Sequence, residues 1–94
     1  MEAGGITLDL ARQKAFTEKR EITLTPKEFA LLRCLMQNKN MVMSREQLLI
    51  KCWGYDYEGE SRAVDTHIKR LREKLGEHAA CIKTVIKAGY RLEG

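Results

Sequence analysis

The sequence predicts a single α+β domain, in which a small antiparallel sheet is followed by three helices and a closing β-hairpin. Three observations lead to this fold class. Apolar and polar residues alternate near the N-terminus, as in a strand. Two helix-capping motifs are each followed by apolar residues at helical spacing. Near the C-terminus, a run of β-branched residues is followed by a turn that contains glycine. The length of 94 residues suits one small domain over 1–94 and is too short for two.

The N-terminal quarter predicts three short strands. Residues Ile6–Leu10 alternate between apolar and polar side chains, which is the period of a half-buried strand. A second strand is expected over Lys14–Thr17, and the polar run Glu18–Arg20 predicts a turn. We expect the third strand over Glu21–Leu24, so that this part of the chain forms a small antiparallel sheet.

A capping pattern predicts the first helix. Thr25 can cap free backbone N–H groups with its hydroxyl, Pro26 suits the first helical position, and Glu28 can reach back to the cap. The helix should end near residues 37–40. Its apolar face is formed by Phe29, Leu31, Leu32, Leu35 and Met36.

The same pattern predicts the second helix. Ser44 is the cap, Gln47 takes the reciprocal position, and Gly54 is a natural stop after the apolar run. The preceding Met41–Met43 segment is expected to be a short extended link. Residues 54–61 contain two glycines, two tyrosines and three acids, which indicates an exposed loop.

A third helix is expected from about residue 61 to Leu75, closed by Gly76. Its apolar stripe, which must face the core, consists of Val64, Ile68, Leu71 and Leu75. The opposite face carries Arg62, Thr66, Lys69 and Glu73, with Arg70 beside them. Arg72 and Asp65 lie on the other flank, where Asp65 is expected to orient a neighbouring arginine or to cap nothing. A helix with one apolar stripe and a basic back has the dimensions of a probe for the DNA major groove, although a solvated surface helix looks the same.

The last segment predicts a β-hairpin over residues 81–92. The strand 81–86 is rich in β-branched residues, Lys87–Gly89 makes the turn, and Tyr90–Leu92 returns. Two helices joined by a longer loop than usual and followed by a basic hairpin match a variant winged helix-turn-helix. In that arrangement the second helix of the pair enters the major groove and the hairpin, or wing, touches the backbone or the minor groove.

The distribution of charge also points to the C-terminal third of the chain as the binding region. The net charge is +4, and residues 1–60 contribute nothing to it because nine basic side chains balance nine acidic ones. Residues 61–94 carry eight basic and four acidic side chains, so the whole excess lies there. This asymmetry predicts an anionic partner for the last third of the chain.

Other function classes lack support in the sequence. No paired-acid signature or phosphate-binding glycine loop occurs, and Cys34, Cys52 and Cys81 are scattered, so we expect no catalysis, no metal, no cofactor and thiols that are buried or idle. A thiol-based sensor that uses Cys81 is a distant alternative. No apolar run is long enough for a membrane span and the start is unlike a signal peptide, which predicts a cytoplasmic protein.

Several motifs together resemble one family closely. They are Leu24–Phe29, Ser44–Leu48, Trp53–Gly54, Arg62–Arg72 and Gly89–Leu92. In this order they are similar to the C-terminal effector domain of OmpR/PhoB-type response regulators, over nearly the full chain. The resemblance implies a winged helix that binds promoter DNA as head-to-tail pairs on tandem direct repeats. Members of this family normally carry a receiver domain as well, and 94 residues are too few to contain one. The resemblance therefore implies either an excised C-terminal domain or a chain that is regulated in another way.

The resemblance also implies roles for individual residues. Thr66 and Arg70 match positions that approach base edges. The positions that match DNA-backbone contacts are Arg45, Trp53, Arg62, His67, Lys69, Arg72, Thr84 and Tyr90. Three of these have an alternative: Tyr90 can equally pack on the core, His67 can equally be packed or solvated, and Trp53 is expected to lie partly in the core. The loop positions Tyr55, Asp56, Tyr57 and Glu58 match the segment that contacts RNA polymerase in the family.

The wing departs from the family pattern. Ile86 stands where an arginine can enter the minor groove, and Lys87 replaces a glycine. We expect Lys87 to supply the lost charge at a phosphate, with a solvated turn lysine as the alternative. The competing function is a protein-interaction module, in which the 54–61 loop binds protein and DNA affinity is non-specific.

Overall fold

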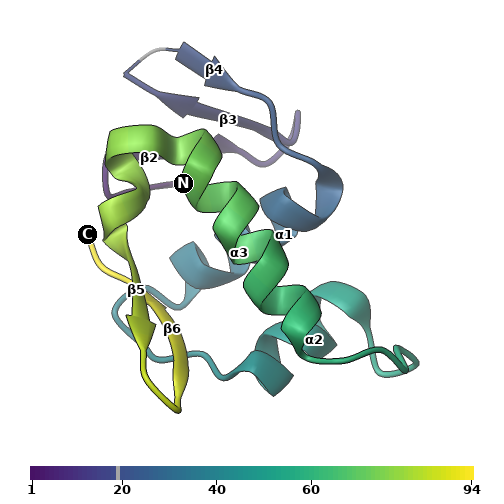
Figure 1. Ribbon diagram of the computed structural model, residues 1–94. Coiled ribbons are helices and arrows are strands. Elements are labelled where there is room, and N and C mark those ends of the chain that lie inside the picture. Colours follow the sequence, from purple (N-terminus) through teal and green to yellow (C-terminus); the bar gives the residue numbers. More distant parts are fainter. Residues whose placement is uncertain (19) are drawn as a thin grey trace.

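The computed structural model describes residues 1–18 and 20–94, and it confirms the predicted fold class (Figure 1). A four-stranded antiparallel sheet at one end is followed by three helices and a two-stranded hairpin. The helices are α1 (Pro26–Gln37), α2 (Arg45–Trp53) and α3 (Arg62–Leu75), and α3 crosses the middle of the molecule (Figure 1). None of the described helices has the length and apolar character needed to cross a membrane.

The sheet contains one strand more than the sequence predicts. Its order is β1 (Glu2–Ala3), β2 (Ile6–Asp9), β3 (Lys14–Thr17) and β4 (Arg20–Ile22). The two-residue β1 pairs with β2 but is too short to show an alternating pattern. The predicted strand 21–24 and the predicted turn are both displaced, because pairing with β3 begins at Arg20. Lys19, the middle residue of that turn, lies outside the described residues.

Both predicted capping boxes are present. The Thr25 hydroxyl accepts a hydrogen bond from the backbone N–H of Glu28, and Glu28 Oε1 accepts one from the N–H of Thr25 at 2.9 Å. Ser44 and Gln47 make the same reciprocal pair at the start of α2. These bonds satisfy backbone donors that have no partner inside the helix, and they fix where each helix begins.

The core lies between the three helices and is closed by both sheets. The α3 stripe that the sequence predicts is fully buried: Val64, Ile68, Leu71 and Leu75. Ile6 and Leu8 of β2 and Leu92 of the hairpin enter the same cluster. The orientation of α3 is therefore set by apolar burial on one side, which leaves its opposite face to the solvent.

An ion pair between a buried carboxylate and a partly exposed lysine joins α1 to the end of α3. Glu28 is 1% exposed, and Lys74 Nζ donates to its Oε1 at 2.5 Å. Burial raises the pKa of Glu28, but the hydrogen bonds from Lys74 and Thr25 outweigh it and hold the pKa below its ordinary value. The ionised carboxylate therefore serves two purposes: it completes the cap of α1 and it holds the C-terminal turn of α3.

The hairpin is reached through a short 3-10 helix, η1 (Gly76–Cys81), which the sequence did not predict. Strands β5 (Ile82–Val85) and β6 (Gly89–Leu92) pair as expected. β5 is one residue shorter at each end than predicted, and β6 begins one residue earlier. Met43 forms the predicted extended link, because it exchanges both backbone hydrogen bonds with Tyr90. A Cβ at Gly89 would lie 2.0 Å from the Met43 carbonyl oxygen, so only glycine permits this approach.

We expect Glu28→Gln to lower the free energy of unfolding at neutral pH by about 2 kcal/mol, because the amide keeps the cap acceptor but loses the charge that holds Lys74. A carboxyl with a lowered folded-state pKa stabilises the fold above its unfolded pKa, and this stability is lost as the pH falls. The difference between variant and wild type should therefore shrink towards about pH 3. Urea unfolding followed by circular dichroism measures both quantities.

Glu21→Gln is the matched control, because Glu21 makes an exposed ion pair with Lys14 at 3.6 Å and should contribute little to stability. If Glu28→Gln lost the same free energy of unfolding at neutral pH and at about pH 3, the role given to the Glu28 charge would be wrong.

Candidate nucleic-acid interface

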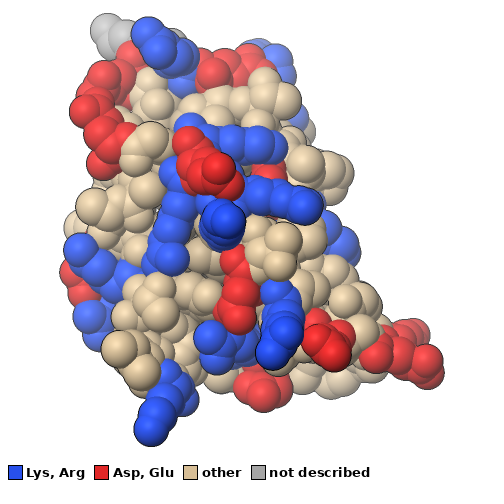
Figure 2. Space-filling model, viewed as in Figure 1, with Lys and Arg blue, Asp and Glu red and all other residues tan. Residues whose placement is uncertain are grey.

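The exposed face of α3 is basic. Figure 2 shows Lys and Arg side chains gathered over α3 and at the tip of the β5–β6 hairpin, with acidic side chains on the loop that follows α2. The exposed side chains of α3 are Arg62, Thr66, Lys69, Arg70, Glu73 and Lys74. The Thr66 hydroxyl donates to the Arg62 carbonyl at 3.3 Å, which leaves its oxygen lone pairs available as acceptors. Thr66 offers a hydrogen-bond acceptor, and Arg70, one helical turn away, offers a guanidinium group with several donors. Recognition of base edges in the major groove uses donors and acceptors of this kind on an exposed helix face.

Asp65 joins three elements at one side of this face. Its Oδ1 accepts a hydrogen bond from Arg45 Nε of α2 at 2.7 Å and a short one from the Tyr90 hydroxyl of β6. Burial raises the pKa of Asp65, but the bonds from Tyr90 and Arg45 outweigh it and hold the pKa below its ordinary value. The carboxylate is thus charged at neutral pH and holds α2, α3 and the hairpin together.

Tyr90 is the centre of this network. It is 5% exposed, and the guanidinium carbons of Arg45 and Arg72 lie 5.9 and 5.6 Å from its ring centroid. Burial and the bond to Asp65 raise the pKa of the Tyr90 phenol, which remains a donor at neutral pH. Its hydroxyl is therefore engaged inside the protein and its ring packs on the core, while the phosphate contact that the resemblance implies stays a prediction.

Arg72 attaches the first strand of the hairpin to α3. One of its terminal nitrogens donates to the Ile82 carbonyl and to the Thr84 hydroxyl, both at 2.8 Å. Arg72 and Thr84, which were both predicted to contact the DNA backbone, thus lie next to each other. The hydrogen bond between them uses part of the hydrogen-bonding capacity of each side chain. The bond fixes the angle at which the wing leaves the helix.

Trp53 and His67 form a second contact between α2 and α3. Their rings meet edge to face with centroids 5.0 Å apart, and Lys27 Nζ lies 5.4 Å from the indole centroid. His67 Nδ1 lies 2.8 Å from the Ala63 carbonyl, which can only accept, so Nδ1 carries the proton. In a neutral imidazole the free Nε2 is then an acceptor, and His67 can donate to a phosphate only when it is protonated.

The wing tip is exposed and irregular. Ile86 is 83% exposed, and Lys87 adopts a left-handed backbone conformation with φ of 65°. Lys83 and Lys87 are both exposed, so the hairpin offers two amines on its outer surface. A lysine in this region of φ is uncommon, and the turn places its side chain beyond the end of both strands.

The 54–61 loop has one tyrosine that packs on α2 and one that is exposed to solvent. Tyr57 packs on Trp53 with ring centroids 6.0 Å apart, whereas Tyr55 is 87% exposed. Asp56 and Glu58 are exposed as well. Beside the loop lies a shallow hollow of about 390 Å³, lined by Gln47, Ile50, Lys51 and Tyr55.

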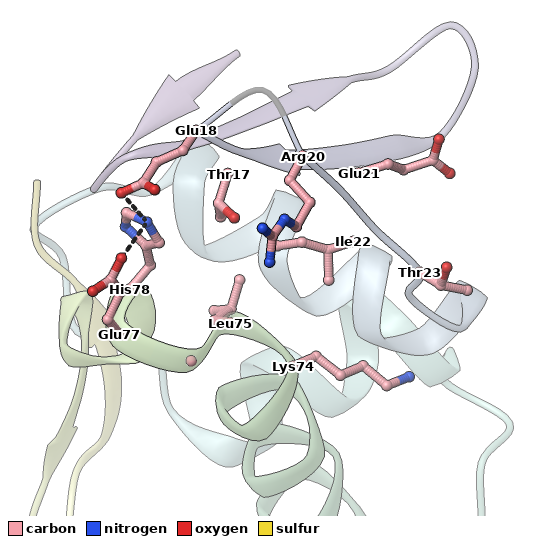
Figure 3. A pocket seen from close by; sticks show the side chains of 11 residues that line it. Thr17, Glu18, Arg20, Glu21, Ile22, Thr23, Lys74, Leu75, Glu77 and His78 are labelled. Carbon is pink, nitrogen blue, oxygen red and sulfur yellow. Dashed lines mark ion pairs between the residues drawn. The ribbon is translucent and has the colours of Figure 1, made fainter.

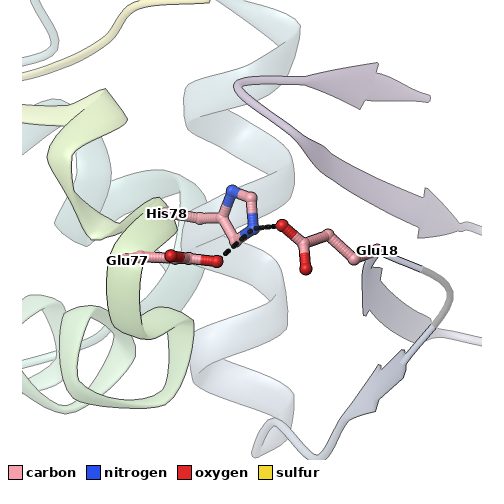
Figure 4. A group of neighbouring side chains, drawn as sticks. All are labelled: Glu18, Glu77 and His78. Atoms are coloured by element: carbon pink, nitrogen blue, oxygen red, sulfur yellow. Dashed lines mark ion pairs between the residues drawn. The ribbon is translucent and has the colours of Figure 1, made fainter.

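A cluster of carboxylates and imidazole lies away from the basic face. It borders a hollow of about 620 Å³ between the β3–β4 hairpin and the end of α3 (Figure 3). Glu18 and Glu77 converge on His78 Nε2 at 3.5 and 4.0 Å, and the three ligand atoms lie within 4.8 Å of one another (Figure 4). The glutamate side chains are 71% and 78% exposed, so this is a solvated group of polar side chains on the surface.

The sequence placed Asp65 on a flank of the third helix, where it was expected to orient a neighbouring arginine or to have no capping role, and it did not reveal the central position of this side chain. The network that contains Asp65 joins residues that lie 20 and 25 positions apart in the chain. A local signal could not reveal it. The pattern that pointed towards it was an acid in the first turn of a mainly basic helix, with an arginine at the start of the preceding helix.

Comparison with known proteins identifies the family. Residues 19–92 match the family described as "Transcriptional regulatory protein, C terminal". The sensory transduction protein RegX3 of Mycolicibacterium smegmatis is 42% identical over 97 residues, and the match covers 100% of this chain and 42% of that protein. The chain thus spans about two fifths of the length of this curated relative.

Solved structures agree with the family match. The DNA-binding domain of CpxR from E. coli has a TM-score of 0.87 and 32% identity, covering 100% of this chain and 95% of the other. The RstA DNA-binding domain of Klebsiella pneumoniae, in complex with the RstA box, has a TM-score of 0.87 and 31% identity, covering 99% and 95%. The family is one of transcription regulators and not of enzymes. The chain therefore belongs to the OmpR/PhoB-type response regulators, of which it is a winged-helix DNA-binding domain.

Proposed function

We propose that this domain places α3 in the major groove of a promoter, with Thr66 and Arg70 at the base edges. The observation that carries this proposal is the exposed basic face of α3 opposite a fully buried stripe (Figure 2). An arginine can donate two parallel hydrogen bonds to guanine, and a threonine can meet either base type through its hydroxyl or methyl group. The domain would act in the cytoplasm, where the promoter is accessible.

The remaining predicted contacts divide into two groups. Arg62, Lys69 and Lys87 are exposed and are proposed to contact phosphates directly. His67 and Trp53 are half-buried and are proposed to contact phosphates at the side of the interface. The second group has polar atoms already engaged inside the protein, and we propose that its members hold the interface in shape while they approach the phosphates. This group is Arg45, Arg72, Thr84 and Tyr90.

We further propose that two copies bind head to tail on tandem direct repeats, under the control of a receiver domain. The support is the family itself and the fact that relatives such as RegX3 are more than twice as long as this chain.

We also propose that the exposed loop contacts RNA polymerase through Tyr55, Asp56, Tyr57 and Glu58. Tyr55 is 87% exposed and lies beside a shallow hollow, so it is suited to anchor a partner protein.

Selection of bound duplexes from a random pool tests the proposal against the alternative of an interaction module. We expect enrichment of a tandem repeat, and recovery of no preferred sequence would support non-specific affinity only. On the selected site, Arg70→Ala should cost about 1–3 kcal/mol of binding and relax the preference at one base position of each repeat. Fluorescence anisotropy on a panel of single-base variants measures both.

Arg12→Ala is the matched control for Arg70→Ala, since Arg12 is an exposed arginine beside β2 at the sheet end of the molecule (Figure 1). It should change neither affinity nor base preference. If Arg70→Ala behaved like this control, Arg70 would not be at a base edge.

Asp65→Ala tests whether Asp65 affects DNA binding by holding its neighbours in position or only through its negative charge. Removal of an acid from a DNA-facing surface should by itself strengthen binding to every sequence. If Asp65 holds α2 and the hairpin in place, the variant should instead lose about 1–2 kcal/mol of binding to the selected site. Its affinity for unrelated DNA should be unchanged or higher. Glu73→Ala, which removes an exposed acid from the same helix, should show only the effect of charge.

Lys87→Ala tests the atypical wing. A phosphate contact implies weaker binding to all sequences alike, with the slope of log K against log salt reduced by about one unit. Binding titrations between low and moderate salt give this slope. Lys14→Ala, on the sheet at the other end of the molecule, should retain the wild-type slope, and a wild-type slope in Lys87→Ala would remove the wing tip from the interface.

A further inference from the structure

The side chain of Lys27 is directed at the end of a neighbouring helix. Lys27 is the second residue of α1, where the partial positive charge of the helix N-terminus disfavours a cation. It is half-buried, and its amine donates to the Cys52 carbonyl, near the end of α2, at 2.6 Å. The last carbonyls of a helix lack N–H partners within the helix and carry a partial negative charge, so Lys27 suits the end of α2 better than the start of α1.

The same amine also contacts the next residue of α2. Lys27 Nζ lies 5.4 Å from the centroid of the Trp53 indole, which is within the range of a cation–π interaction. Trp53 is the last residue of α2 and is followed by Gly54 and the exposed loop. Both interactions are partly shielded from water, because Lys27, Cys52 and Trp53 are all half-buried. A single amine from α1 therefore holds both the backbone and the last side chain of α2.

The indole of Trp53 also contacts two other elements. Its ring meets that of His67 on α3 edge to face, with centroids 5.0 Å apart and an interplanar angle of 83°. The ring of Tyr57, in the 54–61 loop, lies 6.0 Å from the indole between centroids. Contacts from α1, α3 and the loop thus converge on Trp53. A shift of the end of α2 would move Trp53 relative to His67, and both of these residues are proposed phosphate contacts.

We propose that Lys27 is a positioning residue of the DNA interface, which holds Trp53 against His67 so that both can meet the phosphates. Lys27 acts through Trp53 rather than by a contact of its own with DNA, since its amine is engaged within the protein. This inference rests on the proposed phosphate contacts of Trp53 and His67. It gives a role in DNA binding to a residue of α1, a helix to which the proposed interface assigns no contact.

The fluorescence of Trp53, the only tryptophan in the sequence, tests the position of its ring without DNA. Lys27→Met keeps the length and the apolar stem of the side chain but removes the amine. Because the end of α2 is then held less tightly, we expect Trp53 emission at longer wavelength and stronger quenching by acrylamide. Lys27→Arg should restore the wild-type values, because a guanidinium can both donate to the carbonyl and stack on the indole. Lys51→Met, which removes an exposed lysine from the last turn of the same helix, is the matched control and should leave the emission unchanged.

Binding to the selected duplex tests whether the position of Trp53 affects the interface. Lys27→Met should weaken binding about threefold to tenfold, and Lys27→Arg should bind like the wild type. Lys51→Met measures the effect of losing one positive charge near the same helix end and should weaken binding less. In a Trp53→Ala background, Lys27→Met should cause little further loss, because residues that act through one another are not additive.

Unchanged Trp53 emission in Lys27→Met would overturn the proposal. Equal losses of affinity in Lys27→Met and Lys51→Met would also overturn it, as would the same loss from Lys27→Met with and without Trp53, since Lys27 would then act through its charge alone. If Trp53→Ala bound as tightly as the wild type, the proposed phosphate contact of Trp53 would be wrong instead. The emission and the affinities therefore distinguish a failure of the Lys27 role from a failure of the proposed interface.

Discussion

The carboxylate of Asp65 is the interaction on which the arrangement of the DNA-binding elements depends. Apolar burial fixes α3 along its axis, but it does not determine how α2 and the hairpin are oriented towards the exposed face of that helix. Asp65 supplies this orientation by accepting hydrogen bonds from Arg45 and Tyr90 at one oxygen. Arg72, which also lies against the Tyr90 ring, makes a further connection between α3 and the hairpin. The recognition surface is therefore held together by polar bonds laid over an apolar core.

The sequence predicted those elements whose signals are local. The capping boxes at Thr25 and Ser44 lie within four residues each, and the α3 stripe repeats within one helix, so each could be found without knowledge of the fold. The strand β1, which has only two residues, and the ion pair of Glu28 with Lys74, which lie 46 positions apart, offered no such signal. They exist because the tertiary structure brings their partners to them.

The candidate interface was predictable in its composition and not in its internal bonding. Arginine, threonine and tyrosine side chains were expected at phosphates because they are donors. Where Arg45, Arg72 and Tyr90 lie close together, the same donors also bond Asp65, a carbonyl and a hydroxyl of the protein itself. A donor's first partner depends on what the fold places beside it, and a list of residue types does not contain that information. Lys69 and Arg70, which point away from the core, remain as the sequence described them.

The close approach of Gly89 to the Met43 carbonyl has a consequence for how this domain can change over generations. Any side chain at that position would collide with backbone, so the base of the hairpin is locked in register with the segment before α2. The tip beyond it, with Ile86 and Lys87 in the solvent, has no such restriction. Related domains can thus acquire new tips, longer, more basic or more apolar, while the strand that carries Tyr90 keeps its place. The fold separates a part of the wing that must be preserved from a part that is free to diversify.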